Sequence, residues 1–161
     1  MRSLDQSVQR LSNLASKLNE ATDKLNEHLA AAERRLSETR IGLDVWLNDG
    51  ADRVPADPIA ENNEDFFIVG WTKLGEQWRL VAQKFEHDFA TTGFRTAGPQ
   101  PLMNAPRHVR MRALPMVVTI VERLGDEAER WLSDVEKALA GSPTPPSAFD
   151  GGPPIDDDIP F

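Results

Sequence analysis

Residues 65–85 read Asp-Phe-Phe-Ile-Val-Gly-Trp-Thr-Lys-Leu-Gly-Glu-Gln-Trp-Arg-Leu-Val-Ala-Gln-Lys-Phe. Residues 65–73 and 77–85 are rich in aromatic and aliphatic side chains, a composition that is typical of strands. Gly75 lies in the short connection between them, and glycine accepts the backbone conformations that tight turns need. The segment is therefore predicted to form an antiparallel β-hairpin.

A third strand is predicted on the N-terminal side of this hairpin. In residues 41–47 the aliphatic side chains at 41, 43, 45 and 47 alternate with Gly42, Asp44 and Trp46, which is the period of a strand with one buried face. Residues 52–64 contain two prolines and are expected to form an exposed loop. We therefore expect a three-stranded antiparallel β-meander within residues 41–97.

Two tryptophans face each other across the predicted turn of the hairpin. Trp71 and Trp78 are expected to pack against one another, because aromatic residues at strand spacing usually belong to a core. The alternative is that they form an aromatic surface on which a ligand stacks.

Long helices are predicted on both sides of the meander, over residues 3–40 and 104–140. Ser3 and Gln6 have the spacing of a capping box, and Asn104 is the predicted N-cap of the second helix. Apolar or small residues recur in steps of four and three along both helices. In the first they are Leu4, Val8, Leu11, Ala15, Leu18, Thr22, Leu25, Leu29, Ala32 and Leu36; in the second, Val109, Ala113, Val117, Ile120, Leu124, Ala128, Trp131, Val135 and Ala138.

Such a stripe needs a partner helix, either from the same chain or from a second copy, and the seam by itself satisfies either. The similar helix lengths favour an antiparallel, coiled-coil-like helical hairpin with the meander at its far end. The fold predicted for residues 1–140 is thus α+β. The segment from Lys73 to Trp78, and the order helix, meander, helix, are similar to those of a class of bacterial proteins. This likeness adds to the fold prediction alone.

A basic cluster opens the second helix, with Arg107, His108, Arg110 and Arg112 within six positions. These side chains are candidates for contacting phosphates or the acidic tail of the chain itself. The other interpretation is a solvated face, or pairing with acidic residues of the loop in the meander.

Composition narrows the classes of function. The net charge is -8, of which the tail after Ala140 contributes four through its aspartates, so the rest of the chain is acidic too. An acidic body argues against a direct nucleic-acid binder. The chain has no cysteine, and neither a metal-ligand spacing nor a phosphate-binding or nucleophile motif is found. We therefore expect a cytoplasmic protein that is not an enzyme, binds no cofactor or metal, and has no membrane segment.

Residues 141–161 are rich in Gly, Pro, Ser and Asp and are predicted to form a disordered tether. The tail closes on an acidic run followed by Ile-Pro-Phe, with an expected free carboxylate on the last residue. This ending resembles the C-terminal tip of bacterial single-stranded DNA-binding proteins (SSB). The residues that carry the resemblance, and that we predict to bind a partner, are Asp156, Asp157, Asp158, Ile159, Pro160 and Phe161.

The resemblance implies an adaptor or competitor of bacterial or phage origin. Its partners would be the proteins that bind SSB tips, namely helicases, exonucleases, primase-associated factors or recombination mediators. The DNA-binding core of SSB, an OB-fold barrel, is not predicted here, so the resemblance covers the tip alone. The alternative function is that of a coiled-coil structural or homo-oligomeric protein whose functional surface is the β-meander.

Overall fold

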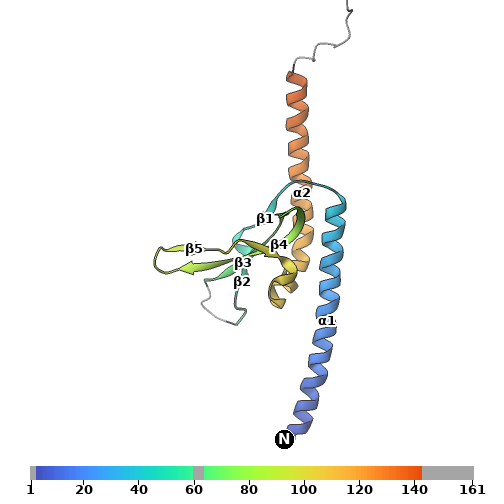
Figure 1. The fold of residues 1–161 in the computed structure, drawn as a ribbon, viewed down its shortest axis with the longest axis vertical. Coiled ribbons are helices and arrows are strands. Elements are labelled where there is room, and N and C mark those ends of the chain that lie inside the picture. The colour runs from blue at the N-terminus through green and yellow to red at the C-terminus, as the bar shows by residue number, and fades with distance from the viewer. Residues whose placement is uncertain (1–2, 60–63, 143–161) are drawn as a thin grey trace, which may run out of the picture.

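The computed structural model describes residues 3–59 and 64–142. Helix α1 (Leu4–Glu38) comes first and helix α2 (Arg107–Gly141) last, with the strands between them (Figure 1). The strands are β1 (Val45–Leu47), β2 (Val54–Pro55), β3 (Phe66–Leu74), β4 (Gln77–Asp88), β5 (Gly93–Arg95) and β6 (Pro99–Pro101). Short 3-10 helices, η1 (Gly50–Asp52) and η2 (Leu102–Asn104), lie before β2 and before α2.

The predicted three-stranded meander is wrong, because the described residues form a six-stranded antiparallel sheet. The hairpin of β3 and β4 is its centre, with Phe66 opposite Phe85 and Leu74 opposite Gln77. Short strands flank it: β1 and β2 pair with β3, and β5 and β6 pair with β4.

The additional strands were missed for a physical reason. They span two or three residues, too few for an alternating pattern, and β2 and β6 contain prolines, which suggest a loop. Proline lacks the backbone N–H that would donate to a neighbouring strand. It is tolerated here because these strands lie at the edges of the sheet, where one side of each strand has no partner strand. β1 likewise covers only the last three residues of the predicted strand over 41–47.

The start of α1 confirms the predicted capping box. The Gln6 backbone N–H donates to Ser3 Oγ (3.3 Å), and the Ser3 N–H donates to Gln6 Oε1 (3.2 Å). α2 begins later than predicted, at Arg107 with Pro106 in the N-cap position, because Asn104 belongs to η2.

The predicted antiparallel helical hairpin is also wrong, because α1 and α2 run in the same direction and are staggered (Figure 1). Arg110, in the first turns of α2, donates a hydrogen bond to Asn26, which lies past the middle of α1. β6 and η2 return the chain to the middle of α1, so α2 starts there and continues beyond the end of α1. The N-terminal half of α1 and the C-terminal half of α2 therefore project at opposite ends of the molecule (Figure 1).

The core lies between the helices and one face of the sheet. Because side chains alternate along a strand, the residues of β3 and β4 that face the helices are Phe67, Val69, Trp71, Leu80 and Ala82. They share one buried cluster with Leu29 and Leu36 of α1 and with Val109, Ala113, Val117, Ile120 and Leu124 of α2. The predicted stripes of both helices are thus buried only where the two helices overlap.

Glu33 of α1 holds the edge of β4 against the helix. Its carboxylate accepts a hydrogen bond from the Leu80 N–H (3.0 Å) and lies 3.4 Å from Arg79 Nη2. β6 pairs with β4 only from Val81 onwards and does not reach the Leu80 N–H. The Glu33 carboxylate accepts the hydrogen bond from this N–H instead, so the backbone donor is satisfied.

Gly70 permits a close approach of β1 to β3. It lies opposite Trp46, and a Cβ atom at this position would meet Val45 O at 2.6 Å and the Trp46 ring at 2.7 Å. The Trp46 indole therefore occupies the space that any larger residue at position 70 would need.

We expect Gly70→Ala to destabilise the protein by about 1–3 kcal/mol, since the added methyl group overpacks this contact. Gly125→Ala is the matched control: nothing lies within 4 Å of its Cβ position in α2. That change should stabilise the helix by about 0.5–1 kcal/mol. Urea unfolding followed by circular dichroism measures both, and an unchanged midpoint for Gly70→Ala would contradict the close packing of Trp46.

Candidate functional site

The predicted partner-binding tip, Asp156 to Phe161, lies outside the described residues. The described part of the tail ends at Ser142, just past α2. This point lies at the outer end of the molecule, away from the sheet (Figure 1).

The structure does not bring the basic cluster into a single patch. Arg110 turns towards α1 and donates to Asn26, while His108 Nε2 lies 2.9 Å from the carbonyl oxygen of Pro55 in β2. Arg107 and Arg112 are exposed. Because helical residues are rotated by about 100° from one to the next, these two side chains leave α2 in directions about 140° apart. The three arginines therefore form no common surface for the predicted contact with a phosphate or with the tail.

The two tryptophans pack as predicted for core residues. Trp71 is fully buried and stacks on Trp78, with 6.4 Å between ring centroids and 20° between ring planes. Trp71 therefore offers no aromatic surface. Trp78 is half-buried and lines a shallow pocket of about 510 Å³ with Arg34, Ser37 and other residues of α1 and β4.

A projecting arm is the site that the sequence did not reveal. The arm, residues 86–95, is the outer end of β4 together with β5, and it points away from the helices (Figure 1). Its pairs are Glu86 with Arg95, His87 with Phe94, and Asp88 with Gly93. Phenylalanines on both sides of the Thr-Thr-Gly sequence at 91–93 were the available signal, but the predicted strand ended at residue 85.

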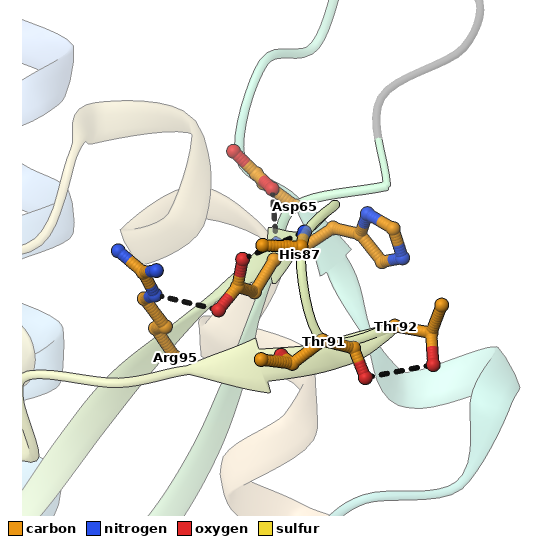
Figure 2. Close-up of polar contacts among 7 residues, drawn as sticks. Asp65, His87, Thr91, Thr92 and Arg95 are labelled. Atoms are coloured by element: carbon orange, nitrogen blue, oxygen red, sulfur yellow. Dashed lines mark hydrogen bonds and ion pairs between the residues drawn. The ribbon is translucent and has the colours of Figure 1, made fainter.

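Carboxylates on two sides fix the backbone of the arm (Figure 2). Asp65, just before β3, accepts a hydrogen bond from the His87 N–H at 2.8 Å, which continues the strand contact beyond the last β3–β4 pair. Asp88 accepts hydrogen bonds from the Ala90 N–H (3.0 Å) and from Arg95 Nε (2.9 Å). The arm is thus held at its base by Asp65 and across its strands by Asp88.

The bonds that Asp88 accepts also lower its pKa below the ordinary value. The Ala90 N–H has the largest effect on the pKa, burial opposes it as the next largest, and Arg95, Thr91 and His87 each lower the pKa further. Each of these groups favours the ionised carboxylate.

An aromatic cluster covers the face of the sheet at the base of the arm. Phe66 stacks on Phe85 (5.3 Å between centroids) and meets Phe94 edge-on (5.2 Å), while the Arg53 guanidinium lies 4.3 Å from the centroid of the Phe66 ring. Phe89, which meets His87 edge-on at 4.6 Å, is 83% exposed at the end of the arm.

This arrangement offers aromatic and charged contacts on a rigid support. The imidazole of His87 adds a polar group, with Nδ1 2.9 Å from Glu64 Oε2. Among residues 3–59 and 64–142, no group of three or more His, Cys, Asp or Glu side chains is arranged to hold a metal ion. The arm therefore presents exposed aromatic and charged side chains, residue types that are found at interfaces.

Comparison with protein-family models, with curated proteins and with solved structures finds no match for this chain. Of the helices that the structure describes, none has the length and apolar character needed to cross a membrane.

We expect the low pKa of Asp88 to depend on Arg95. In the folded state the pKa lies below that of an unfolded aspartate, about 3.9. Ionised Asp88 therefore stabilises the fold above about pH 4, and this contribution is lost as the pH falls through the folded-state pKa. Arg95→Gln should raise the Asp88 pKa, as measured by NMR titration of the carboxyl carbon.

Arg53→Gln is the control. It also removes an arginine near the arm, but Arg53 contacts the Phe66 ring and is not among the groups that lower the Asp88 pKa. It should leave the titration of Asp88 unchanged. An equal Asp88 pKa in the wild type and in Arg95→Gln would contradict the role of this ion pair.

Proposed function

We propose that this protein is a non-enzymatic adaptor that docks on DNA replication or repair enzymes through residues 156–161. It either recruits enzymes that bind SSB tips or competes with SSB for them. The observation that supports this proposal is the sequence of the tip, three aspartates followed by Ile159, Pro160 and Phe161.

The residue types suit a small apolar pocket with a basic rim. Burying the Phe161 side chain contributes about 1.5–3 kcal/mol, and Pro160 reduces the backbone entropy that docking costs. The aspartates favour approach to a basic surface and make binding sensitive to salt. Together these terms correspond to an affinity of around micromolar for a single tip.

The position of α2 is compatible with this role. Residues 131–141 extend the helix past the sheet, by about 16 Å at 1.5 Å per residue. The tail is joined to this outer end, so the sheet and α1 leave room for a partner enzyme there (Figure 1).

The decisive experiment is a competition assay. The full-length protein is titrated into a complex of a fluorescent SSB-tip peptide with an exonuclease that binds it, and displacement is followed by anisotropy. Phe161→Ala should weaken displacement at least tenfold, because the side chain that fills the pocket is removed. Phe149→Ala, a matched change in the same tail, should leave displacement unchanged.

Failure of the wild type to displace the peptide from exonuclease, helicase, primase-associated and recombination partners would refute the proposed docking. Equal losses in both variants would show that the tail acts through general apolar character and not through the tip.

A second candidate function is that of a structural or oligomeric protein that uses the sheet as its binding surface. The exposed Phe89 and Phe94 of the arm favour it, because aromatic side chains are enriched at interfaces. In this case Phe89→Ser should abolish partner capture in a pull-down from bacterial lysate, while Phe161→Ala should retain it. The reverse pattern would eliminate the arm as the main binding surface.

A further inference from the structure

Each long helix extends beyond its contact with the other, and each extension carries exposed apolar side chains. We call residues 4–22 the α1 extension and residues 125–141 the α2 extension. In the first, the exposed large residues are Leu4, Val8, Leu11, Leu14 and Leu18; in the second, Trp131, Leu132, Val135 and Leu139. Such stripes are typical of a helix that packs against a partner.

The exposed stripes continue the contact that α1 and α2 make within the chain. Leu29 and Leu36 of α1 are buried against α2, and Leu18 and Leu11 follow from Leu29 in the same four-three repeat. The buried stripe of α2 ends at Leu124 and continues into Trp131 and Val135 with the same spacing. A helix–helix interface thus already exists, and only half of each stripe takes part in it.

The stagger makes the two extensions complementary in length. Both helices have 35 residues and they are parallel. The part of α1 that does not contact α2 is therefore about as long as the part of α2 that does not contact α1. A second copy shifted along the axis by about ten helical turns, roughly 54 Å, would place its α2 extension beside the α1 extension of the first. The parallel helix pair would then continue from one copy to the next.

The residues that meet in this arrangement follow from the register within the chain. Leu29 and Ala113, like Leu36 and Ile120, have the same sequence separation, 84, as the bonded pair Asn26 and Arg110. In the assembly the separation becomes 120, and the difference of 36 residues is ten turns of 3.6 residues, so the same faces of the two helices meet. The resulting layers mostly set a larger residue against a smaller one, as good packing requires. The layers are Val8 with Ala128, Leu11 with Trp131, Ala15 with Val135, and Leu18 with Ala138.

Charge also favours pairing of unlike extensions. Arg10 lies beside Leu11 and Leu14 on one flank of α1, and Lys17 is one heptad further along. Glu129 and Glu136 have the corresponding spacing on α2. In the part of the chain that the structure describes, none of these four residues forms an ion pair. Pairing of two α1 extensions would instead set Arg10 and Lys17 against the same residues of the other copy.

We propose that copies of this chain associate head to tail, with the α1 extension of one copy packed in parallel against the α2 extension of the next. The interface is heterologous, so a pair of copies still has one unoccupied extension of each kind, and the assembly grows by addition of copies. This self-association is independent of the function proposed for the tip.

The test uses full-length variants blocked at one extension each. The α1-blocked variant carries Leu11→Glu and Leu18→Glu, and the α2-blocked variant carries Trp131→Glu and Val135→Glu. All four side chains are exposed, so both variants should keep the wild-type circular dichroism and unfolding midpoint. Asn13→Glu adds a charge to the outer face of α1 as a control.

Sedimentation velocity should show wild type and Asn13→Glu growing in mass as the concentration rises. Each blocked variant alone should be a monomer, with association weakened at least tenfold. An equimolar mixture of the two should form a dimer and nothing larger, because one intact α1 extension meets one intact α2 extension.

Other outcomes overturn the proposal. A dimer of the α2-blocked variant alone indicates pairing of α1 with α1, and a dimer of the α1-blocked variant alone indicates pairing of α2 with α2. A wild type that stays monomeric at all concentrations eliminates self-association through these surfaces.

Discussion

The packing of α2 on the helix-facing side of β3 and β4 is the contact on which the other features of this structure depend. Trp71 is fully buried there, together with Leu80 from the neighbouring strand. To reach this face, α2 must begin beside the middle of α1, where Arg110 meets Asn26. Since the chain approaches from β6 and η2, the helix then runs in the same direction as α1 and passes its end. The stagger of the helices is thus a consequence of how the sheet is covered.

The stagger separates the surfaces that are available for binding. The arm projects to one side of the sheet, the helix extensions project at opposite ends, and the tail is joined to the outer end of α2 (Figure 1). The described part of the chain ends at Ser142, past the outer end of α2, while the arm with its exposed Phe89 belongs to the sheet. The arm, residues 86–95, shares no residue with either helix extension, so each of these surfaces can be changed by mutation without altering the other.

Self-association and tail docking would reinforce each other. Each copy in a head-to-tail assembly contributes one tail, so a partner with several tip-binding pockets would meet several tips at a high effective concentration. Weak single-site affinity is then sufficient for stable recruitment. The α2 extension carries the apolar stripe of the proposed interface, and the tail begins at its end. Self-association and tail docking would therefore use neighbouring parts of the chain.

The sequence by itself determined the local features of this protein. The capping box at Ser3, the hairpin of β3 and β4, and the repeats of both helices follow from interactions between residues close in the chain, and each has a recognisable pattern. The core position of Trp71 was predictable for the same reason, while the partner-binding tip at residues 156–161 stays a prediction from its residue types. Only the tertiary structure decided the direction of α2, the additional short strands, the dispersal of the basic cluster and the framework of the arm. These depend on contacts between distant residues, such as Asp65 with His87 and Arg110 with Asn26. A helical stripe specifies that a partner is needed, but its pattern is the same for a parallel or an antiparallel neighbour, and for the same chain or another copy.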